Sequence, residues 1–254
     1  MTDNTPSRVP WSFIAIGIAI VISTYLAASS WERVKMKPPD RSIQVTGSAK
    51  KQIMSDQIEW SASIATQDMD RTAAYRNLHG YVQTTLAYLK EQGVKEQEIR
   101  ASSATVEERY ETEYVGIGEE RVERQAFRGY ATSETVSVRS TDVARVERIS
   151  REVTQLLERG VPISSSAPAY FYTKLGELKI EMLAEAARDA RNRAENIVRQ
   201  AGGDARLGDL RAADMGVINV NPVNSTQTSW EGNNDTTSLE KDIITIVHIT
   251  FELI

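Results

Sequence analysis

An uncharged apolar stretch opens the chain, and its length suits a membrane. Residues 9–31 carry no charge and are dominated by aliphatic side chains. As a helix rising about 1.5 Å per residue, they cover roughly 34 Å, enough for a hydrocarbon core of about 30 Å. Trp11 and Trp31 lie at the two ends, where indole rings favour the headgroup region. We therefore expect an N-terminal tail over 1–10 and a transmembrane helix over 11–31.

A cleaved signal peptide is the alternative interpretation of this stretch. Residues 27–29 are small (Ala, Ala, Ser) and have the composition of a cleavage site. However, Arg8 alone makes a weak basic n-region, and the uncharged stretch is long for a signal. We therefore favour a retained anchor.

The segment after the apolar stretch predicts a linker and raises a question of orientation. Paired prolines within residues 37–40 favour a stiff, extended backbone, so we assign 32–41 as a linker. Basic residues follow the helix at four positions: Arg33, Lys35, Lys37 and Arg41. Only Arg8 and the terminal amine precede it. Taken alone, the positive-inside rule would place the following domain in the cytoplasm.

From Ser42 onward, a period of two indicates strands. Ile58, Trp60, Ala62 and Ile64 alternate with polar residues, as in a half-buried strand. The same pattern predicts further strands over 43–47, 103–114, 121–139, 169–172, 207–220 and 242–254. In the last of these, apolar residues occupy both faces for part of the length, so we expect it to be central in its sheet.

Three segments show helical spacing. The first covers 70–92, with Asp68 or Asp70 as the cap and Gly93 at its end. The second follows a cap within 140–142 and is closed by Gly160 and Pro162. The third covers 174–200, and its predicted buried seam is Leu175, Leu178, Met182, Ala186, Ala190, Ala194, Ile197 and Ala201. Residues 42–254 are therefore expected to form one α+β domain.

Two polar segments of this domain are candidate contact surfaces. The strand pair 103–139, turning near Gly116-Ile117-Gly118, carries seven acidic residues near its tip: Glu107, Glu108, Glu111, Glu113, Glu119, Glu120 and Glu123. Four arginines accompany them: Arg109, Arg121, Arg124 and Arg128. Cross-strand pairing on a solvated ribbon explains them, and so does an arm that docks on a neighbouring subunit. Residues 221–238, rich in Asn, Ser, Thr and Gly, are expected to form a mobile loop.

Charge and composition exclude several classes of function. The formal net charge is −5 and the basic residues are not clustered, which argues against nucleic acid as a partner. The chain has no cysteine, so it has no disulfide, thiol nucleophile or thiolate metal site.

Candidate chemistry is sparse. We interpret His79 and His248 as structural or surface residues rather than ligands or bases. Ser164, Ser165 and Ser166 have the composition of a loop. We interpret Asp204 and Asp209 as turn residues, because two carboxylates supply fewer oxygen ligands than the six to eight that calcium takes. Five tyrosines at strand spacing suit core and interface better than a ligand pocket: Tyr110, Tyr114, Tyr130, Tyr170 and Tyr172. We assign no catalytic, cofactor-binding or metal-ligating residue.

Several short motifs, in order along the chain, resemble the SIMPL-domain family. The strand 43–49 (IQVTGSA) and the segment 55–60 (SDQIEW) carry the first matches. Others are Gly93-Val94 leading to 98–100, Gly129-Tyr130-Ala131 before the strand 136–139, and residues 184–195 followed by Gly202-Gly203. That family includes periplasmic immunogenic proteins and stress-associated periplasmic proteins of bacteria.

The resemblance implies a fold, a compartment and an assembly. It implies two related βαβ-type units with helices packed on antiparallel sheets, an extracytoplasmic domain, and large ring- or cage-like homo-oligomers. It supplies no agreed activity and no catalytic residues. We therefore expect a membrane-anchored, non-enzymatic scaffold or binding protein of the cell envelope, its domain periplasmic despite the charges after the helix.

Two other functions stay open at this point. One is an envelope hydrolase with an unrecognised carboxylate or serine site. The other is an accessory subunit of another envelope complex, with the 103–139 strand pair or the 221–238 loop as its contact surface.

Overall fold

A computed structural model describes residues 11–35, 41–116 and 121–254, with side chains described from residue 15 to residue 31 in the first range. The predicted tail over 1–10, the prolines of the linker and the Trp11 ring lie outside the described residues. So do Glu119, Glu120 and most of the predicted turn. Over the rest, the chain is a mixed α+β protein with antiparallel sheets, as expected.

The chain divides into two compact units, which we describe separately. The first consists of Met1–Val45, Asn192–Ala213 and Ile249–Ile254, and the second of Thr46–Arg191 and Asp214–His248. In the first unit, Arg206 and Ile254 exchange two backbone hydrogen bonds of 2.7 and 3.0 Å. Leu253 N–H also donates to the Arg41 carbonyl at 2.9 Å. These bonds connect the residues just before the strands that begin at Ser42 and Leu207 to the end of the strand that finishes at Leu253.

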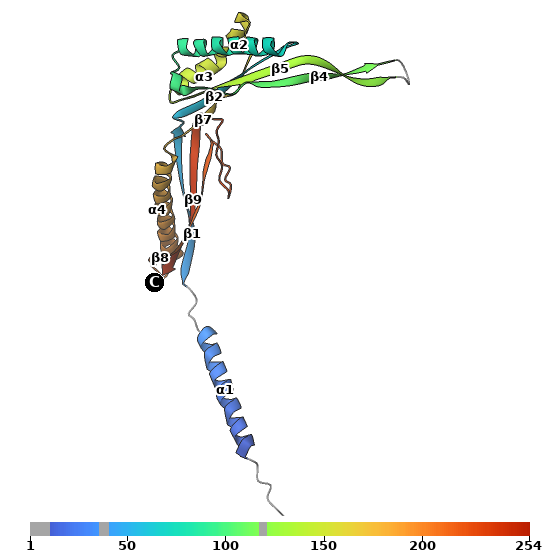
Figure 1. The fold of residues 1–254 in the computed structure, drawn as a ribbon. Coiled ribbons are helices and arrows are strands. Elements are labelled where there is room, and N and C mark those ends of the chain that lie inside the picture. Colours follow the sequence, from blue (N-terminus) through green and yellow to red (C-terminus); the bar gives the residue numbers. More distant parts are fainter. Residues whose placement is uncertain (1–10, 36–40, 117–120) are drawn as a thin grey trace, which may run out of the picture. The chain divides into compact units, whose positions relative to one another are not determined.

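The predicted N-terminal helix is present as α1, Trp11–Lys35 (Figure 1). Its described apolar side chains are exposed, including Ile18 at 56%, Val21 at 68% and Leu26 at 56%. Within the part of the chain that the structure describes, no helix meets the length and apolarity of a membrane span.

A six-stranded sheet forms the larger part of the second unit. Its strands are β2 (Gln57–Asp68), β3 (Ile99–Ala101), β4 (Thr105–Val115), β5 (Val122–Ser140), β6 (Ile163–Ser165) and β7 (Ala169–Phe171). The order is β3-β5-β2-β6, while β4 pairs with β5 and β7 with β2. All of these pairings are antiparallel. Ile58, Trp60, Ala62 and Ile64 are at most 2% exposed, which confirms the period-two prediction for β2.

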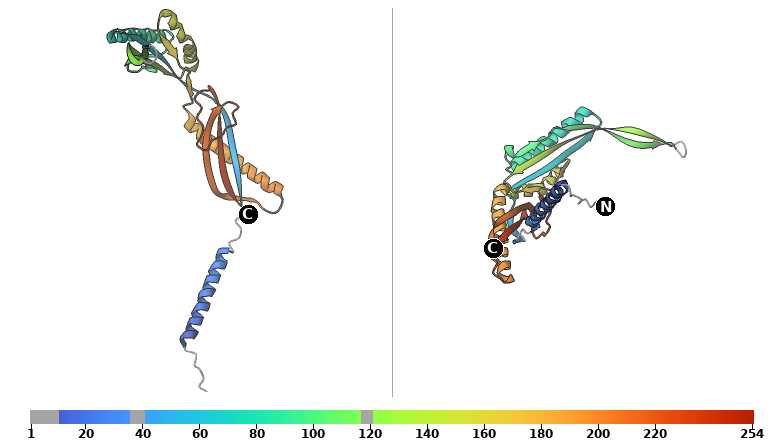
Figure 2. Two further views of the ribbon diagram at one scale, coloured as in Figure 1. Left: turned by 90° about the vertical axis from the view of Figure 1, so that its right-hand side faces the viewer. Right: turned by 90° about the horizontal axis from the view of Figure 1, so that it is seen from below.

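Helices cover one face of this sheet (Figures 1 and 2). They are α2 (Arg71–Glu91), α3 (Val143–Glu152), and the short 3-10 helices η1 (Glu96–Glu98) and η3 (Val153–Arg159). Asp70 caps α2 by accepting from Ala73 N–H at 2.7 Å, and Asp142 caps α3 by accepting from Arg145 N–H at 3.1 Å. The buried residues of β2 share one core with Leu78 of α2 and Ile149 of α3, so both helices lie on the same face.

Two predictions about these elements were incomplete. The second predicted helix changes from α to 3-10 geometry at Val153 and ends at Gly160, whose φ is +78°. The segment at Ser164 and Ser165 is part of β6, not a loop, because Ala62 and Ile64 of β2 pair with it. Its serine-rich composition predicts a loop, but pairing with the buried strand β2 stabilises it as a strand.

A three-stranded sheet has the order β1-β9-β8, formed by β1 (Ser42–Met54), β8 (Leu207–Pro222) and β9 (Glu240–Leu253). The predicted central place of the last strand is confirmed. Helix α4 (Leu175–Ala201) packs against β1, and a methyl group added at Gly47 would lie 2.1 Å from the Ala186 carbonyl oxygen. Met182, Ala186 and Ala190 are fully buried, as the alanine seam predicts. Ile197 and Ala201 were wrongly placed on that seam, because both are exposed, Ile197 at 51%.

Candidate functional site

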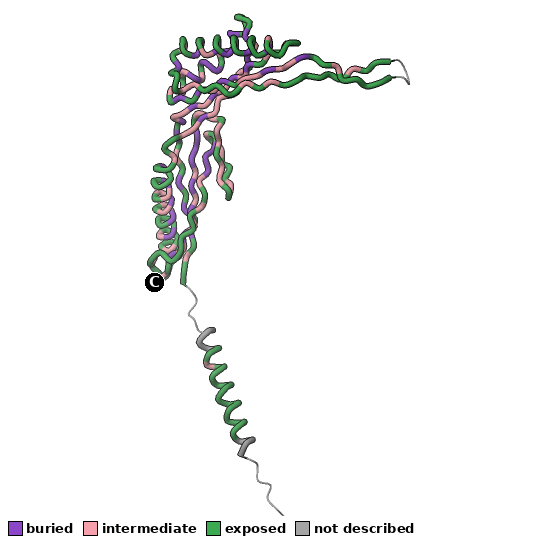
Figure 3. Tube along the Cα trace, viewed as in Figure 1, coloured by how far each residue is buried: buried purple, intermediate pink, exposed green. Residues whose placement is uncertain are grey.

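The hairpin formed by β4 and the outer half of β5 extends beyond the helices of its own unit (Figure 1). We call Thr105–Val115 and residues 122–131 the hairpin arm. No residue of β4 is buried, and most of the arm is exposed (Figure 3). Among the described strands, β4 pairs only with β5, and no described residue of the ribbon beyond Gly129 is buried.

Aromatic rings gather on one face of the hairpin arm. Tyr110 lies opposite Phe127 in the strand register, with ring centroids 5.5 Å apart in an edge-to-face arrangement. Tyr130 continues the row, 5.3 Å from Phe127. Tyr110 is 55% exposed and Phe127 is 37% exposed. We call these three rings the aromatic face; exposed rings in contact with one another are typical of protein interfaces.

Charged residues of the arm pair across its two strands at a β-bulge. The register shifts between Arg109 and Tyr110, which leaves Arg128 as the extra residue on β5. Its guanidinium contacts Glu111 at 2.8 Å and Glu113 at 2.5 Å. The predicted cross-strand charge pairing is therefore present here, although exposed pairs of this kind stabilise a protein little.

The base of the arm is anchored by a glycine. Gly129 has a φ of +106°, and a methyl group there would lie 2.4 Å from the Asp68 carbonyl oxygen. Only glycine adopts this conformation freely and lets β5 pass so close to the end of β2. This is the physical reason for one of the motifs that carried the family resemblance.

A buried lysine, which the sequence did not reveal, fixes a second region. Lys241 of β9 is 2% exposed, and its ammonium donates to the Tyr170 carbonyl at 2.7 Å and to the Asp235 carbonyl. Burial lowers the pKa of Lys241, and the nearby Asp235 carboxylate opposes this only in part. Through these two hydrogen bonds, the Lys241 ammonium connects β9 to β7 and to the segment that precedes β9.

Asp242, the next residue, is also 2% exposed, and its side chain binds Lys50. It forms an ion pair with Lys50 at 2.8 Å and accepts from Asn224 N–H at 2.8 Å. The Lys50 hydrogen bond lowers the pKa of Asp242, while burial works against this and is outweighed. The pair therefore attaches the loop after β8 to β1 and β9.

Two buried asparagines hold the 221–238 segment. Asn219 Oδ1 accepts from the backbone N–H groups of Ser229 and Asn233, at 2.8 and 3.1 Å. Asn221 donates to the Gln227 carbonyl at 2.6 Å and accepts from Asn233 at 2.9 Å. The segment is irregular beyond Pro222, as predicted, and these bonds organise it; its mobility stays a prediction.

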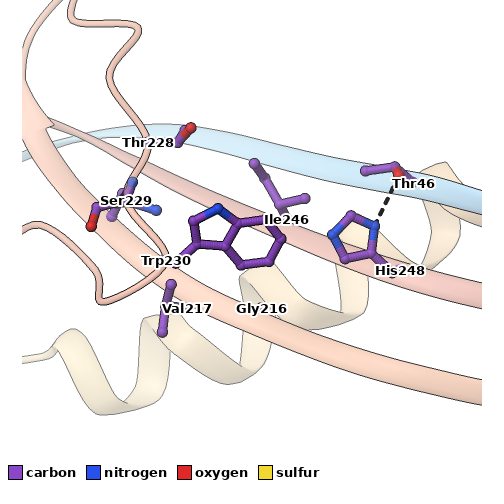
Figure 4. A pocket seen from close by; sticks show the side chains of 9 residues that line it. Thr46, Gly216, Val217, Thr228, Ser229, Trp230, Ile246 and His248 are labelled. Carbon is purple, nitrogen blue, oxygen red and sulfur yellow. Dashed lines mark hydrogen bonds between the residues drawn. The ribbon is translucent and has the colours of Figure 1, made fainter.

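A pocket of about 260 Å³ lies between this segment and the three-stranded sheet (Figure 4). Thr46 of β1, Gly216 and Val217 of β8, Ile246 and His248 of β9 and Trp230 are among its lining residues. The Trp230 and His248 rings lie nearly parallel, at 22°, with centroids 6.3 Å apart. Trp230 is 85% exposed.

The two histidines differ in their surroundings. His79 is exposed on α2, beside Tyr75 at 6.3 Å, as a surface residue would be. His248 Nδ1 is hydrogen-bonded to Thr46 Oγ1 at 3.0 Å, and its ring lines the pocket. The sequence did not single out the pocket, although a tryptophan within a loop of small polar residues was an available signal.

The structure places three candidate site residues, Ser165, Asp204 and Asp209, apart from any catalytic or metal-binding arrangement among the described residues. Ser165 Oγ accepts from the Trp60 indole N–H at 3.0 Å and donates to the Ser150 carbonyl at 2.7 Å, which fixes its hydroxyl. Asp204 is exposed in a bend, but Asp209 lies within β8 rather than in the predicted turn. Among the described side chains, no three acidic or histidine residues gather as metal ligands would.

The five tyrosines do not form one site. Tyr110, Tyr114 and Tyr130 belong to the hairpin arm, where Tyr114 lies 4.4 Å from the Arg121 guanidinium. Tyr170 is buried, and it lines a small cavity of about 150 Å³ with Tyr172 and Lys241.

One comparison with known proteins gives a positive result. The family model named SIMPL, described as "Protein of unknown function (DUF541)", matches residues 43–246. A search among curated proteins found no match.

Proposed function

The chain belongs to the SIMPL family, and from that premise we propose that it is a membrane-anchored, non-enzymatic protein of the bacterial cell envelope that assembles into homo-oligomers through its hairpin arm. The domain acts as a scaffold or binding protein on the periplasmic side of the inner membrane. Ring- or cage-like assembly and two related βαβ-type units, with α2 and α4 as their helices, belong to the same proposal.

The aromatic face of the hairpin arm is the observation that carries this proposal. Tyr110 and Phe127 leave 55% and 37% of their surface exposed on a two-stranded ribbon that has no buried residue among the described residues beyond Gly129. Exposed apolar rings cost free energy in water, and covering them with a second copy recovers about 25 cal/mol per Å² of apolar area. Charged residues on the same arm give the contact its orientation.

Sedimentation velocity on the full chain in detergent tests the assembly. We expect a homo-oligomer for the wild type and at least a tenfold weaker association for the double variant Tyr110→Ser/Phe127→Ser. Tyr75→Ser is the matched control, because Tyr75 is also exposed, at 51%, but lies on α2. A wild type that is monomeric at micromolar concentration would refute the proposed role as an oligomeric scaffold.

The anchor rests on the character of α1. The helix has 25 residues, and over 15–31, where its side chains are described, the apolar residues lie all around it rather than along one stripe. A helix that is apolar on every side needs an apolar surrounding, and lipid supplies one. We expect the protein to stay with membranes after alkaline carbonate washing; release, with a mature N-terminus near Ser29, would instead indicate a cleaved signal.

The side of the membrane is tested separately. A reporter that is active only outside the cytoplasm, fused after Ile254, is expected to be active. An inactive reporter on a well-expressed fusion would place the domain inside, as the basic residues in the last turn of α1 and just after it suggest on their own.

A further inference from the structure

We propose that the pocket beside Trp230 and His248 binds a small, uncharged aromatic molecule that carries a hydroxyl group. The pocket is built from residues 46–248 of one compact unit, so the inference does not depend on the membrane anchor or on self-association.

The volume of the pocket selects the size of the ligand. At about 260 Å³ it exceeds a cavity of about 150 Å³, which is enough for benzene. It is smaller than the pockets of about 300–1,000 Å³ that hold drug-sized ligands. One ring, or two fused rings, is therefore the size that fits.

The walls select an apolar and aromatic ligand. Val217 and Ile246 supply aliphatic contacts, and Figure 4 shows the Trp230 indole beside them. At 85% exposure, Trp230 retains nearly all the surface that a stacked ring would cover. Offset stacking adds to the gain from burial, so an aromatic ring is favoured over a saturated ring of equal size.

The charge of the pocket selects a neutral ligand. Among the described residues that line it, none is Asp, Glu, Lys or Arg. A phosphate, carboxylate or ammonium group would lose its hydration without gaining an ionic partner. Nucleotides and acidic metabolites are therefore poor candidates.

His248 selects the hydroxyl group. Its Nδ1 is occupied by Thr46 Oγ1 at 3.0 Å, and Figure 4 shows the other ring nitrogen on the side nearer Trp230. Among the described residues, we find no hydrogen-bond partner for this Nε2. Whether Nε2 is the donor or the acceptor depends on the tautomer, and a hydroxyl group can satisfy either state.

Isothermal titration calorimetry of the full chain in detergent, referenced to protein-free micelles, tests the site. Phenol is the probe, toluene is the ring without the hydroxyl group, and cyclohexanol is the hydroxyl group without the aromatic ring. We expect saturable one-to-one binding of phenol with a Kd of about 1 mM, as befits about seven heavy atoms. Toluene and cyclohexanol should bind at least about fivefold more weakly.

Variants locate the binding. Trp230→Leu should weaken phenol binding at least about tenfold, and His248→Phe should reduce it to the level of toluene. Tyr75→Leu is the matched control and should leave binding unchanged. Its ring is also exposed beside a histidine, His79, at the same 6.3 Å and at 21°, but on a helix surface.

Three results would overturn the inference. One is equal binding of phenol and cyclohexanol, which would mean that no ring is recognised. Another is an equal loss of binding in Tyr75→Leu and Trp230→Leu. The third is unchanged phenol binding in Trp230→Leu together with weaker subunit association, which would make Trp230 a protein contact. Circular dichroism of each variant confirms that the fold is kept.

Discussion

At Gly47, strand β1 and helix α4 are so close that a single methyl group does not fit. The Cβ of an alanine there would lie 2.1 Å from the Ala186 carbonyl oxygen and 2.6 Å from the Ala190 amide nitrogen. Both contacts are to helix backbone, which cannot rotate away as a side chain would. Gly47→Ala therefore forces α4 and β1 apart.

The size of the effect follows from this geometry. Ordinary contact begins near 3.4 Å, so α4 must withdraw by about 1.3 Å. A gap of about 0.5–1 Å already removes a quarter to a half of the dispersion energy of each contact along the seam. Met182 and Ala186, fully buried on that seam, would lose much of their packing. We expect a loss of about 3 kcal/mol in the free energy of unfolding, at the upper end of the range for an overpacked core.

Native-state hydrogen exchange measures the effect where it occurs. Amides of α4 should exchange faster in Gly47→Ala, while those of α2 change less, and the melting temperature should fall by about 6–12 °C. Gly80→Ala is the matched control, because Gly80 lies within α2 and an added methyl group meets nothing within 4 Å. That variant should gain about 0.5–1 kcal/mol.

Two results would contradict such a close contact between α4 and β1. One is a loss of less than about 1 kcal/mol in Gly47→Ala, and the other is a change of stability in the same direction in both variants.

Four further predictions concern single side chains. Gly129→Ala should destabilise the protein by about 3 kcal/mol in urea unfolding, because a left-handed conformation and a backbone clash coincide there. Ser165→Ala should cost about 1–3 kcal/mol by the same assay, since it leaves the buried Trp60 indole N–H without its acceptor; a hydrolase nucleophile would instead reveal itself by lost activity at unchanged stability. Arg128→Gln should change stability by less than about 0.5 kcal/mol, because its ion pairs are exposed; a larger loss would make the arm's charges structural. Asp242→Asn should matter most near neutral pH: the folded pKa of Asp242 is depressed, so its stabilisation is present above about pH 4 and lost as the pH falls through the folded pKa. Unfolding free energies of wild type and variant should converge on acidification, and a constant difference would contradict this.

The regular elements could be predicted from the sequence because local pattern and burial agree in them. Ile58, Trp60 and Ala62 alternate and are buried, and Asp70 caps the helix that follows. Elements that depend on distant partners could not be found in this way. Strand β6 is only three residues long and exists because β2 pairs with it.

The candidate sites were predictable only in part. Acidic residues and arginines marked the hairpin arm, but which of them pair was decided by the bulge at Arg128. Lys241 could not be recognised as buried, because one of its two acceptors, the carbonyl of Tyr170, lies 71 positions away in the sequence. Ile197 follows the helical period of the α4 seam and is nevertheless exposed, because a period indicates a face but not where the partner ends.

The hairpin arm exposes an unpaired strand edge as well as the proposed contact surface. In the described chain, its outer strand β4 leaves one row of backbone amides and carbonyls unpaired, and such rows recruit further strands into fibres. The bulge at Arg128 interrupts the even spacing that stacking requires, and the carboxylates of Glu107 and Glu111 would repel those of an identical neighbour added in register. The bulge and these carboxylates therefore oppose amyloid-like growth, a safeguard that the proposed assembly of molecules through their rings would need.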